Sequence, residues 1–431
     1  MLLVYTHKIT NRFSYTARHL FTRILGVEVD FTTKVEDFIK HKGPKITYTK
    51  KPLQNEFFIR SNDLLFEQGI NDIALKMGNW DGLPCFFEAG ERSNVPFDIF
   101  AASFYLLSRY EEYLPHVKDH LGRFPPETGL AHQEGFLERP LVDLWSKKLL
   151  MLLQERFPDL MYRPKTYRFT SIINVTSSHS YALRGFSRGF AGFVHDLGRF
   201  KLRRLARRVA VWFDPKKDPF DNFSGLIAIH KRFKMKTMFF FQFADYSRHD
   251  KNISIHKNKF RFLIKSIADY SRVSLSASMA SSMNNAILIE EKARLSQLIN
   301  RPVNSSRMRY NKVVLPETYR NLVEAEFTDD YSMGFTHRIG YRAGTSSPFY
   351  FYDINLEVQQ PIKIHPFAFC DHALVNCTTK DEVFALTDPL FDEAKQVGSD
   401  FVMVFSNQLL GSKHKINWLE LYEAMVKRYY V

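Results

Sequence analysis

The sequence predicts an α/β protein of two domains, the second of them built on a parallel sheet or a β/α barrel. The chain has 431 residues, which is too long for one small domain. From Tyr167 onward, short apolar segments alternate with segments of helical periodicity, the pattern of βα units. The stretch "PDLMYRPKTY" interrupts the pattern before that point and is typical of a linker. We therefore expect a smaller α/β N-terminal domain at residues 1–165 and a barrel domain at residues 166–431.

The N-terminal part carries strand and helix patterns of its own. Two expected strands, "LLVYT" and "VEVDFTT", flank the amphipathic segment "NRFSYTARHLFTRIL". A helix is predicted over Asp98–Leu114, with Asp98 as its N-cap and with an apolar face of Phe100, Phe104, Leu107 and Tyr110. A further helix is predicted over "VDLWSKKLLMLLQERF". These elements are expected to form one unit.

The C-terminal part is predicted to alternate between strands and helices. The expected strands are "YRFTSIINV", the buried "MKTMFFFQF", "VSLSAS", a strand end at "IGYRAG" and a last strand at "FVMVFS". The expected helices are "DNFSGLIAIHKRF" (capped near Asp221 or Asn222), "KFRFLIKSIADYS", "NNAILIEEKARLSQLI", "LPETYRNLVEAE" and "WLELYEAMVKRYY". In a β/α barrel the functional loops follow the carboxyl ends of the strands, so a site is expected there.

Composition indicates an ordinary globular chain in a reducing compartment. It is 45% hydrophobic and 25% charged. The 40 Phe and 20 Tyr indicate an aromatic core or, as the alternative, an aromatic-lined groove on which sugars stack. The cysteines are too few for a disulfide framework: Cys85, Cys370 and Cys377. The N-terminus lacks the apolar run of a signal peptide, and no apolar run approaches the roughly 18 residues of a membrane span. A cytoplasmic location is expected.

A basic segment carries much of the net charge of +14. In "GRFKLRRLARRVAVWF", residues 198–213, arginines and one lysine alternate with apolar residues at helical spacing, which predicts a basic amphipathic helix. The charged face of such a helix can simply face water, lie on an anionic membrane surface or bind a phosphorylated ligand. No nucleic-acid motif accompanies it, so nucleic acid is not an expected partner.

Four segments resemble the polysaccharide deacetylase (carbohydrate esterase) family, in its bacterial branch with an extra N-terminal domain. They are "DIFAASFYLLSRYEEYLPH" with "HLGRFPPETGLA", "DDYSMGFTHRIGYRAGTSSPFYFYDI", "HPFAFCDHAL", and "FVMVFSNQLLG" followed by "WLELYEAMVKRY". The resemblance implies a distorted, partly open β/α barrel. It also implies hydrolysis of acetyl groups by a metal such as Zn²⁺, which is held by Asp and His and assisted by an Asp base and a His acid.

The residues at the matching strand ends depart from that pattern. Where the family has a D-x-D pair, this sequence has Asn174 and Thr176, and Ser276 stands where a ligand His is expected. Arg309 replaces a further His, and Ser406 replaces the catalytic His of the last strand. Neutral oxygens are weak ligands, and an arginine repels a cation. We therefore predict a catalytically inactive site without a metal.

Several polar residues remain as candidates for ligand binding: Arg342, Asp330, Asp371 and Asn407. The resemblance implies that the loop containing Arg342 lines the active site, where Arg342 could bind a substrate carboxylate or phosphate. Its structural alternative is a salt bridge to Asp353 or Asp330.

A substitute metal site is the alternative to an inactive one, with Zn²⁺ or another divalent ion held by His179, His365 and Asp371. His372 is adjacent to Asp371, and on a strand the two side chains would diverge.

Three functions follow from these observations. The first is an inactive deacetylase-like protein of cell-surface polysaccharide metabolism that binds a glycan, a lipid-linked sugar or a partner protein. The second is a divergent, metal-dependent carbohydrate deacetylase. The third is a scaffold that binds a partner protein through residues 1–165. The basic helix adds the expectation of a peripheral contact with the inner membrane.

Overall fold

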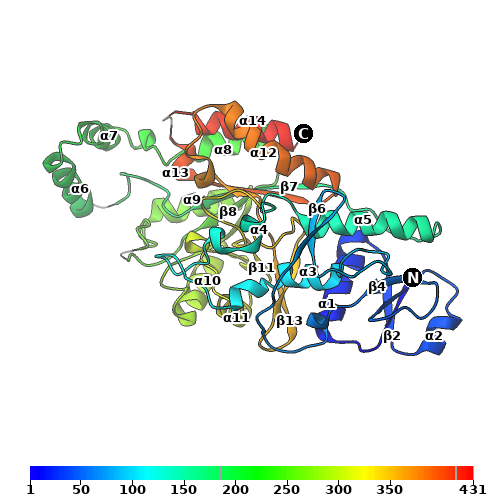
Figure 1. Cartoon of the computed structure of the whole chain (residues 1–431). Coiled ribbons are helices and arrows are strands. Elements are labelled where there is room, and N and C mark those ends of the chain that lie inside the picture. Colours follow the sequence, from blue (N-terminus) through cyan, green and yellow to red (C-terminus); the bar gives the residue numbers. More distant parts are fainter. Residues whose placement is uncertain (185, 248, 413–414, 431) are drawn as a thin grey trace.

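The computed structural model describes residues 1–184, 186–247, 249–412 and 415–430. The described part is a mixed α/β structure with two main sheets (Figure 1). The smaller sheet is parallel, has the order β2-β1-β3-β4 and lies in the N-terminal part. Its strands are β1 (Leu2–Thr6), β2 (Val29–Thr32), β3 (Lys45–Thr49) and β4 (Phe57–Arg60). Beside it is the hairpin of β5 (Met77–Trp80) and β6 (Leu83–Phe86).

The N-terminal part also contains helices, most of which share one continuous apolar core with this sheet. They are α1 (Asn11–Arg18) with the π-helical turn η1 (His19–Leu25), α2 (Val35–Lys40), α3 (Ile99–Leu107), α4 (Leu130–Gln133) and α5 (Leu141–Arg156). Asp98 caps α3 as predicted, since its Oδ1 accepts hydrogen bonds from the amides of Phe100 and Ala101 at 3.0 Å.

Helix α3 differs from its prediction in two respects. It ends at Leu107 rather than Leu114, because Arg109 adopts a left-handed conformation (φ 55°) and a 3₁₀ turn, η3 (Tyr110–Tyr113), follows. Every residue of the helix is buried, so it has no single apolar face.

The described residues of the C-terminal part form a nine-stranded sheet in the order β12-β13-β11-β10-β9-β8-β7-β15-β14. All the pairings are parallel except β12 with β13. The strands are β7 (Arg168–Val175), β8 (Met238–Phe241), β9 (Arg272–Ala277), β10 (Ser305–Met308), β11 (Asp329–Asp330), β12 (Phe349–Asp353), β13 (Val358–Ile364), β14 (Phe369–Cys370) and β15 (Asp400–Ser406). The apolar β8 is buried along its whole length, as predicted.

Helices alternate with these strands: α8 (Phe223–Arg232), α9 (Asn258–Ala268), α10 (Asn285–Ile299), α11 (Glu317–Glu324), α12 (Lys380–Gln396), α13 (Asn407–Leu410) and α14 (Trp418–Tyr429). Helices α8, α12 and α14 lie together on one side of the sheet (Figure 1). The expected strand at "IGYRAG" is wrong, since those residues form turns. Asn222 is the N-cap of α8, but its side chain donates to the carbonyl of Asn407 (2.6 Å) instead of capping the helix.

Two further helices, α6 (Phe186–Gly198) and α7 (Leu202–Phe213), form a helical hairpin inserted between β7 and α8. The hairpin projects from the body of the molecule at the left of Figure 1. The basic helix is therefore present but begins at Leu202, after a turn at residues 199–201. None of the helices in the described ranges is both long and apolar enough to cross a membrane.

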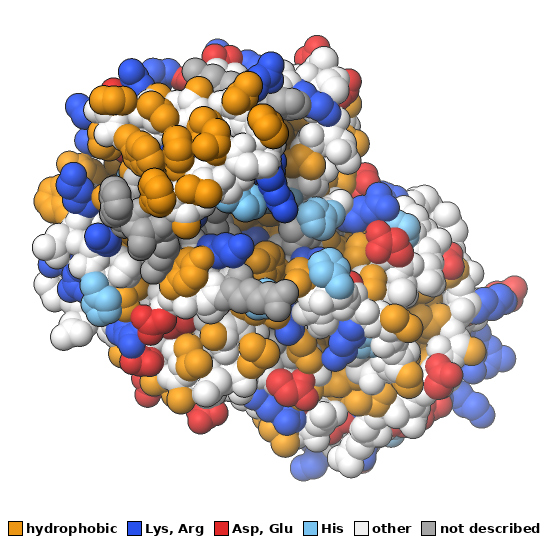
Figure 2. All heavy atoms as spheres, turned by 90° about the vertical axis from the view of Figure 1, so that its left-hand side faces the viewer, with side chains coloured by type: hydrophobic (Ala, Val, Ile, Leu, Met, Phe, Trp, Pro, Cys, Tyr) orange, Lys and Arg blue, Asp and Glu red, His pale blue; other side chains and the backbone are white. Residues whose placement is uncertain are grey.

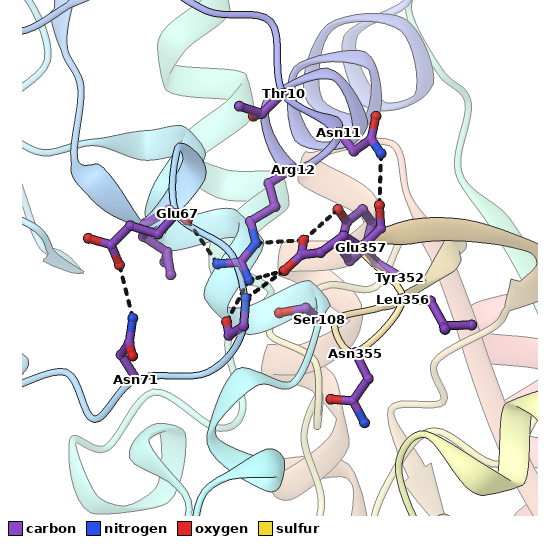
Figure 3. Close-up of polar contacts among 12 residues, drawn as sticks. Thr10, Asn11, Arg12, Glu67, Asn71, Ser108, Tyr352, Asn355, Leu356 and Glu357 are labelled. Carbon is purple, nitrogen blue, oxygen red and sulfur yellow. Dashed lines mark hydrogen bonds and ion pairs between the residues drawn. The ribbon is translucent and has the colours of Figure 1, made fainter.

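The two parts are joined by a partly buried ion pair between α1 and the β12–β13 turn (Figure 3). Arg12 is buried and donates to the Glu357 carboxylate through Nε (2.9 Å) and Nη2. The same carboxylate accepts from the amide of Gly69 (2.9 Å) and the hydroxyl of Tyr352 (3.0 Å). Glu357 lies in the turn between β12 and β13 and has a positive φ (51°). Its contacts with Arg12 and Gly69 therefore hold this β-hairpin, which the sequence did not predict, against the N-terminal part.

Candidate functional site

The carboxyl ends of the parallel strands meet at one edge of the large sheet, and several predicted site residues lie there. Asn174 on β7 is the register partner of Ser406 on β15, so these two lie side by side. Ser276 on β9 is the register partner of Arg307 on β10. Thr176 follows β7, and its hydroxyl accepts from Gln408 Nε2 at 2.9 Å. Binding sites of open α/β sheets form at such an edge.

Asn174, Ser276 and Ser406 have neutral side chains. Among the described residues, the buried Asn174 Oδ1 and Ser276 Oγ have no hydrogen-bond partner. The amide and hydroxyl of Ser406 both donate to Asp371 Oδ2 at 2.7 Å. Unpaired neutral oxygens of this kind are suited to bound water rather than to a divalent ion.

The cation at the strand ends is Arg307, which the sequence analysis missed. Its side chain is buried and lies 4.6 Å over the ring of Phe367. Nη2 donates to Asn311 Oδ1 at 2.6 Å and Nη1 to the carbonyl of Tyr331, whereas Nε has no partner among the described residues. Burial lowers the pKa of Arg307, and the nearby acidic groups Cys370, Asp330 and Asp371 oppose that effect.

Arg309, which replaces a family histidine, lies beside this cation and is partly neutralised. Its guanidinium lies 4.4 Å over the ring of Tyr310, and its Nε is 4.0 Å from Asp250 Oδ1. The Asp250 carboxylate is buried and also accepts from Gln242 Nε2 at 2.5 Å. Arg309 thus belongs to a network around Asp250, and Arg307 is the residue that brings positive charge into the sheet interior.

One group of potential metal ligands does converge here, formed by Cys370, Asp371 and His372. The prediction that Asp371 and His372 diverge is wrong, because residues 371–374 form a 3₁₀ turn instead of continuing the strand. His372 Nδ1 lies 2.8 Å from Asp371 Oδ1, and Cys370 Sγ lies 3.3 Å from the same oxygen. The hydrogen bond with Asp371 raises the pKa of His372 to about 11. Burial would raise the pKa of Asp371, but the bond with His372 holds it below its usual value.

The predicted substitute site of His179, His365 and Asp371 is not assembled. Among the described residues, the only converging set of three ligand atoms is that of residues 370–372. His179 Nδ1 bonds to Ser178 Oγ (2.9 Å), and His365 Nε2 bonds to Asp329 (2.7 Å). Each histidine is held at its own strand end, so the three side chains do not meet.

Arg342 forms the structural salt bridge, but with a different acid from those expected. Its Nε and Nη2 donate to Glu112 of the N-terminal part at 2.8 and 2.5 Å, and both side chains are buried. Asp353 pairs instead with Arg320, and Asp330 accepts from Ser332 and Ser306. The geometry therefore favours a role for Arg342 in joining the two parts.

Asn407 also joins two loops through hydrogen bonds. Its Nδ2 donates to the carbonyl of Ser177, which follows β7, at 3.0 Å and to that of Phe220 at 3.1 Å. It holds the end of β7 against the segment that leads into α8.

A large cleft opens between α7 and the strand ends, with a volume of about 1170 Å³. From the sheet side it is lined by His372 and Ser406, and from the hairpin and its connections by six basic side chains: Arg184, Arg203, Arg204, Arg207, Arg208 and Lys217. Among the described lining residues the only carboxylate is Asp196, which is already paired with Arg208 Nη2 at 2.7 Å. In Figure 2, basic side chains and histidines lie along the hollow that runs below the hydrophobic patch. The cleft is strongly electropositive.

Residues 2–158 match the model of a protein family described as a family of unknown function, DUF7033, which covers less than half of the chain. No curated protein matches the chain. Its structural neighbours include a putative polysaccharide deacetylase from Mycobacterium smegmatis (12% identity, TM-score 0.41, 62% of this chain and 84% of that one). Others are Puue allantoinase (11%, 0.38, 61% and 83%) and a probable polysaccharide deacetylase from Pseudomonas aeruginosa PAO1 (12%, 0.37, 61% and 84%).

Proposed function

We propose that this chain is a deacetylase-like protein without hydrolytic activity that binds an anionic glycan, one bearing phosphate or carboxylate, in the cleft between α7 and the strand ends. The observation that carries the proposal is the cleft itself: among its described lining residues, basic side chains outnumber the one carboxylate, which is already paired. Guanidinium groups bind phosphate and carboxylate in a bidentate manner, and several of them around one cavity strengthen such binding. A cytoplasmic role in cell-surface polysaccharide metabolism is part of the proposal.

The absence of hydrolysis is inferred from the strand ends. A deacetylase of this type needs a metal or an activated water opposite the acetyl carbonyl. Asn174, Ser276 and Ser406 supply no negative charge, and Arg307 adds a positive one. Ser406 donates its hydroxyl to Asp371, and this carboxylate is a weak base because the bond with His372 holds its pKa below the usual value.

Binding can be measured by calorimetry with N-acetylglucosamine 1-phosphate as the probe and N-acetylglucosamine as the uncharged reference. We expect only the phosphate to bind, with an affinity that falls as salt rises. Arg203→Gln/Arg207→Gln should weaken binding at least about tenfold, because a charge-assisted hydrogen bond contributes about 1.5–3 kcal/mol. Arg199→Gln is the matched control, since Arg199 is exposed on the same hairpin but does not line the cleft. Equal losses in both variants, or equal binding of the two sugars, would contradict the proposal.

A metal-dependent hydrolase is the second candidate, and the convergence of Cys370, Asp371 and His372 is what favours it. A metal there would have to displace the proton between Asp371 and His372, because a protonated imidazole is not a ligand. Elemental analysis after dialysis against Zn²⁺ separates the candidates. Bound zinc that is lost in Cys370→Ser, together with acetate release from chitin oligosaccharides, would establish the hydrolase.

A further inference from the structure

Helix α7 turns its arginines, rather than most of its apolar side chains, toward the body of the protein, although Val211 is also buried. Its arginines at positions 203, 204, 207 and 208 line the cleft, on the side toward the body of the protein. Leu202 is 67% exposed and Phe213 88% exposed, although large apolar side chains of an amphipathic helix normally face the core. Helix α8 shows the usual orientation, with Phe223, Leu226 and Ile229 all buried.

The exposed apolar side chains of the hairpin form a continuous surface, which we call the hairpin patch. Figure 2 shows it as the gathering of hydrophobic side chains in the upper part of the view. Helix α6 contributes Val194 and Leu197, the turn contributes Phe200 (84% exposed), and α7 contributes Leu202, Trp212 and Phe213. The two helices contact each other through Phe193 and Trp212, whose rings lie 5.5 Å apart. Contiguous exposed patches of this kind mark interaction sites.

We propose that the hairpin patch docks into the surface of an anionic lipid bilayer and holds the protein at the membrane without spanning it. The charges at its border identify the partner. Arg199 and Lys201 flank Phe200 in the turn, and Lys216 lies in the 3₁₀ turn that follows α7. Apolar and aromatic side chains that enter the acyl boundary, with lysine and arginine at headgroup level, are the pattern of interfacial helices.

The docking would also set the position of the cleft. The cationic face of α7 lies on the opposite side of the helix from the hairpin patch, so the cleft would open beside the membrane surface. An anionic glycan carried on a membrane lipid could then reach the strand ends. The docking itself does not depend on this, because the hairpin patch and the cleft use different side chains.

Vesicle sedimentation with the full-length protein tests the proposal. Vesicles of phosphatidylcholine and phosphatidylglycerol in equal parts should bind the protein, and vesicles of phosphatidylcholine alone should bind it at least about tenfold more weakly. Leu202→Ser/Phe213→Ser should lower the partition coefficient at least about tenfold for each side chain, because each removes a large apolar side chain from the acyl boundary.

The matched control is Ile39→Ser/Val117→Ser, which removes side chains of similar exposure (67% and 82%) from the N-terminal part. It should leave vesicle binding unchanged. Binding to neither vesicle type, or an equal loss in the control variant, would overturn the proposal. So would sedimentation equilibrium showing that the hairpin patch is buried between two copies of the chain, with dimers that Leu202→Ser/Phe213→Ser abolishes. Binding of N-acetylglucosamine 1-phosphate should survive in that variant, which separates failure of docking from failure of the proposed function.

Discussion

Replacing Glu112 with Gln tests whether Arg342 joins the two parts of the protein. Glu112 accepts from Arg109 Nε (2.8 Å) and from Arg342 Nε and Nη2 (2.8 and 2.5 Å). Burial alone would raise the pKa of Glu112, but the charges of Arg342 and Arg109 lower it to about 2. The carboxylate is therefore ionised at neutral pH, and Gln removes the charge while keeping the shape. Removing one partner of a buried ion pair costs about 3–5 kcal/mol.

The expected loss of unfolding free energy lies near the lower end, at about 3 kcal/mol, since Arg109 keeps a second acid, Glu111, at 2.7 Å. The size of this loss depends on pH. A lowered folded-state pKa stabilises the native state above pH 4.5, and that contribution disappears as pH falls toward about 2, so the two proteins should converge in acid.

Urea unfolding at neutral pH provides the measurement for Glu112→Gln. The control is Glu88→Gln, whose partner Lys76 lies 3.3 Å away with both side chains exposed; such a pair contributes about 0–1 kcal/mol. If Glu112→Gln loses no more unfolding free energy than the control, the Arg342–Glu112 ion pair does not hold the two parts together.

Two other variants give independent checks of the structure. Burial raises the pKa of Glu291 from 4.5 to about 7, so the stability of the native protein should fall as pH rises between those values. Glu291→Gln should remove that slope and stabilise the protein above pH 7 by on the order of 3 kcal/mol, measured by urea unfolding across that range. Gly340 has φ 118°, and an added Cβ would lie 2.4 Å from the carbonyl oxygen of Leu137. Gly340→Ala should therefore cost about 2–4 kcal/mol, against about 1 kcal/mol for Gly82→Ala, which has φ 85° but open space around it; equal losses would show that the contact is not limiting.

Local physics accounts for the elements that the sequence predicted well. Asp98 caps α3 because a carboxylate before an apolar helix can accept from the free amides of its first turn. The residues of β8 are all apolar and lie between neighbouring strands on both sides, so a short apolar run between polar segments was a sufficient signal.

The features that could not be predicted depend on contacts far along the chain. In β10, all four residues are buried although three of them are polar. The strand therefore shows no alternation of apolar and polar residues from which the burial of Arg307 could be predicted. The β12–β13 turn is held by Arg12, some 345 positions away. The amphipathic pattern of α7 was visible, but which face turns outward depends on the cleft behind it.

Whether the charge of Arg307 or merely the lost ligands keeps a metal from the strand ends can be decided by restoring the ligands. At about 6 Å and an effective dielectric constant of about 20, one guanidinium repels a divalent ion by about 5 kcal/mol, roughly four orders of magnitude in affinity. Arg307 is the register partner of Ser276 on the adjacent strand, and adjacent strands are about 4.8 Å apart. We therefore take about 6 Å as the separation between the guanidinium and an ion bound at Ser276.

The variant Asn174→Asp/Ser276→His/Ser406→His should therefore still fail to retain Zn²⁺ after dialysis, whereas adding Arg307→Met should give a site that retains it. Arg307→Met alone, with no carboxylate or imidazole introduced, should hold no zinc and serves as the control for non-specific binding. Circular dichroism establishes that each variant is folded, and competition with a chromophoric chelator measures the affinity. Equal zinc affinity in the triple and quadruple variants would show that the missing ligands alone explain the inactive site, and that the buried cation has another purpose.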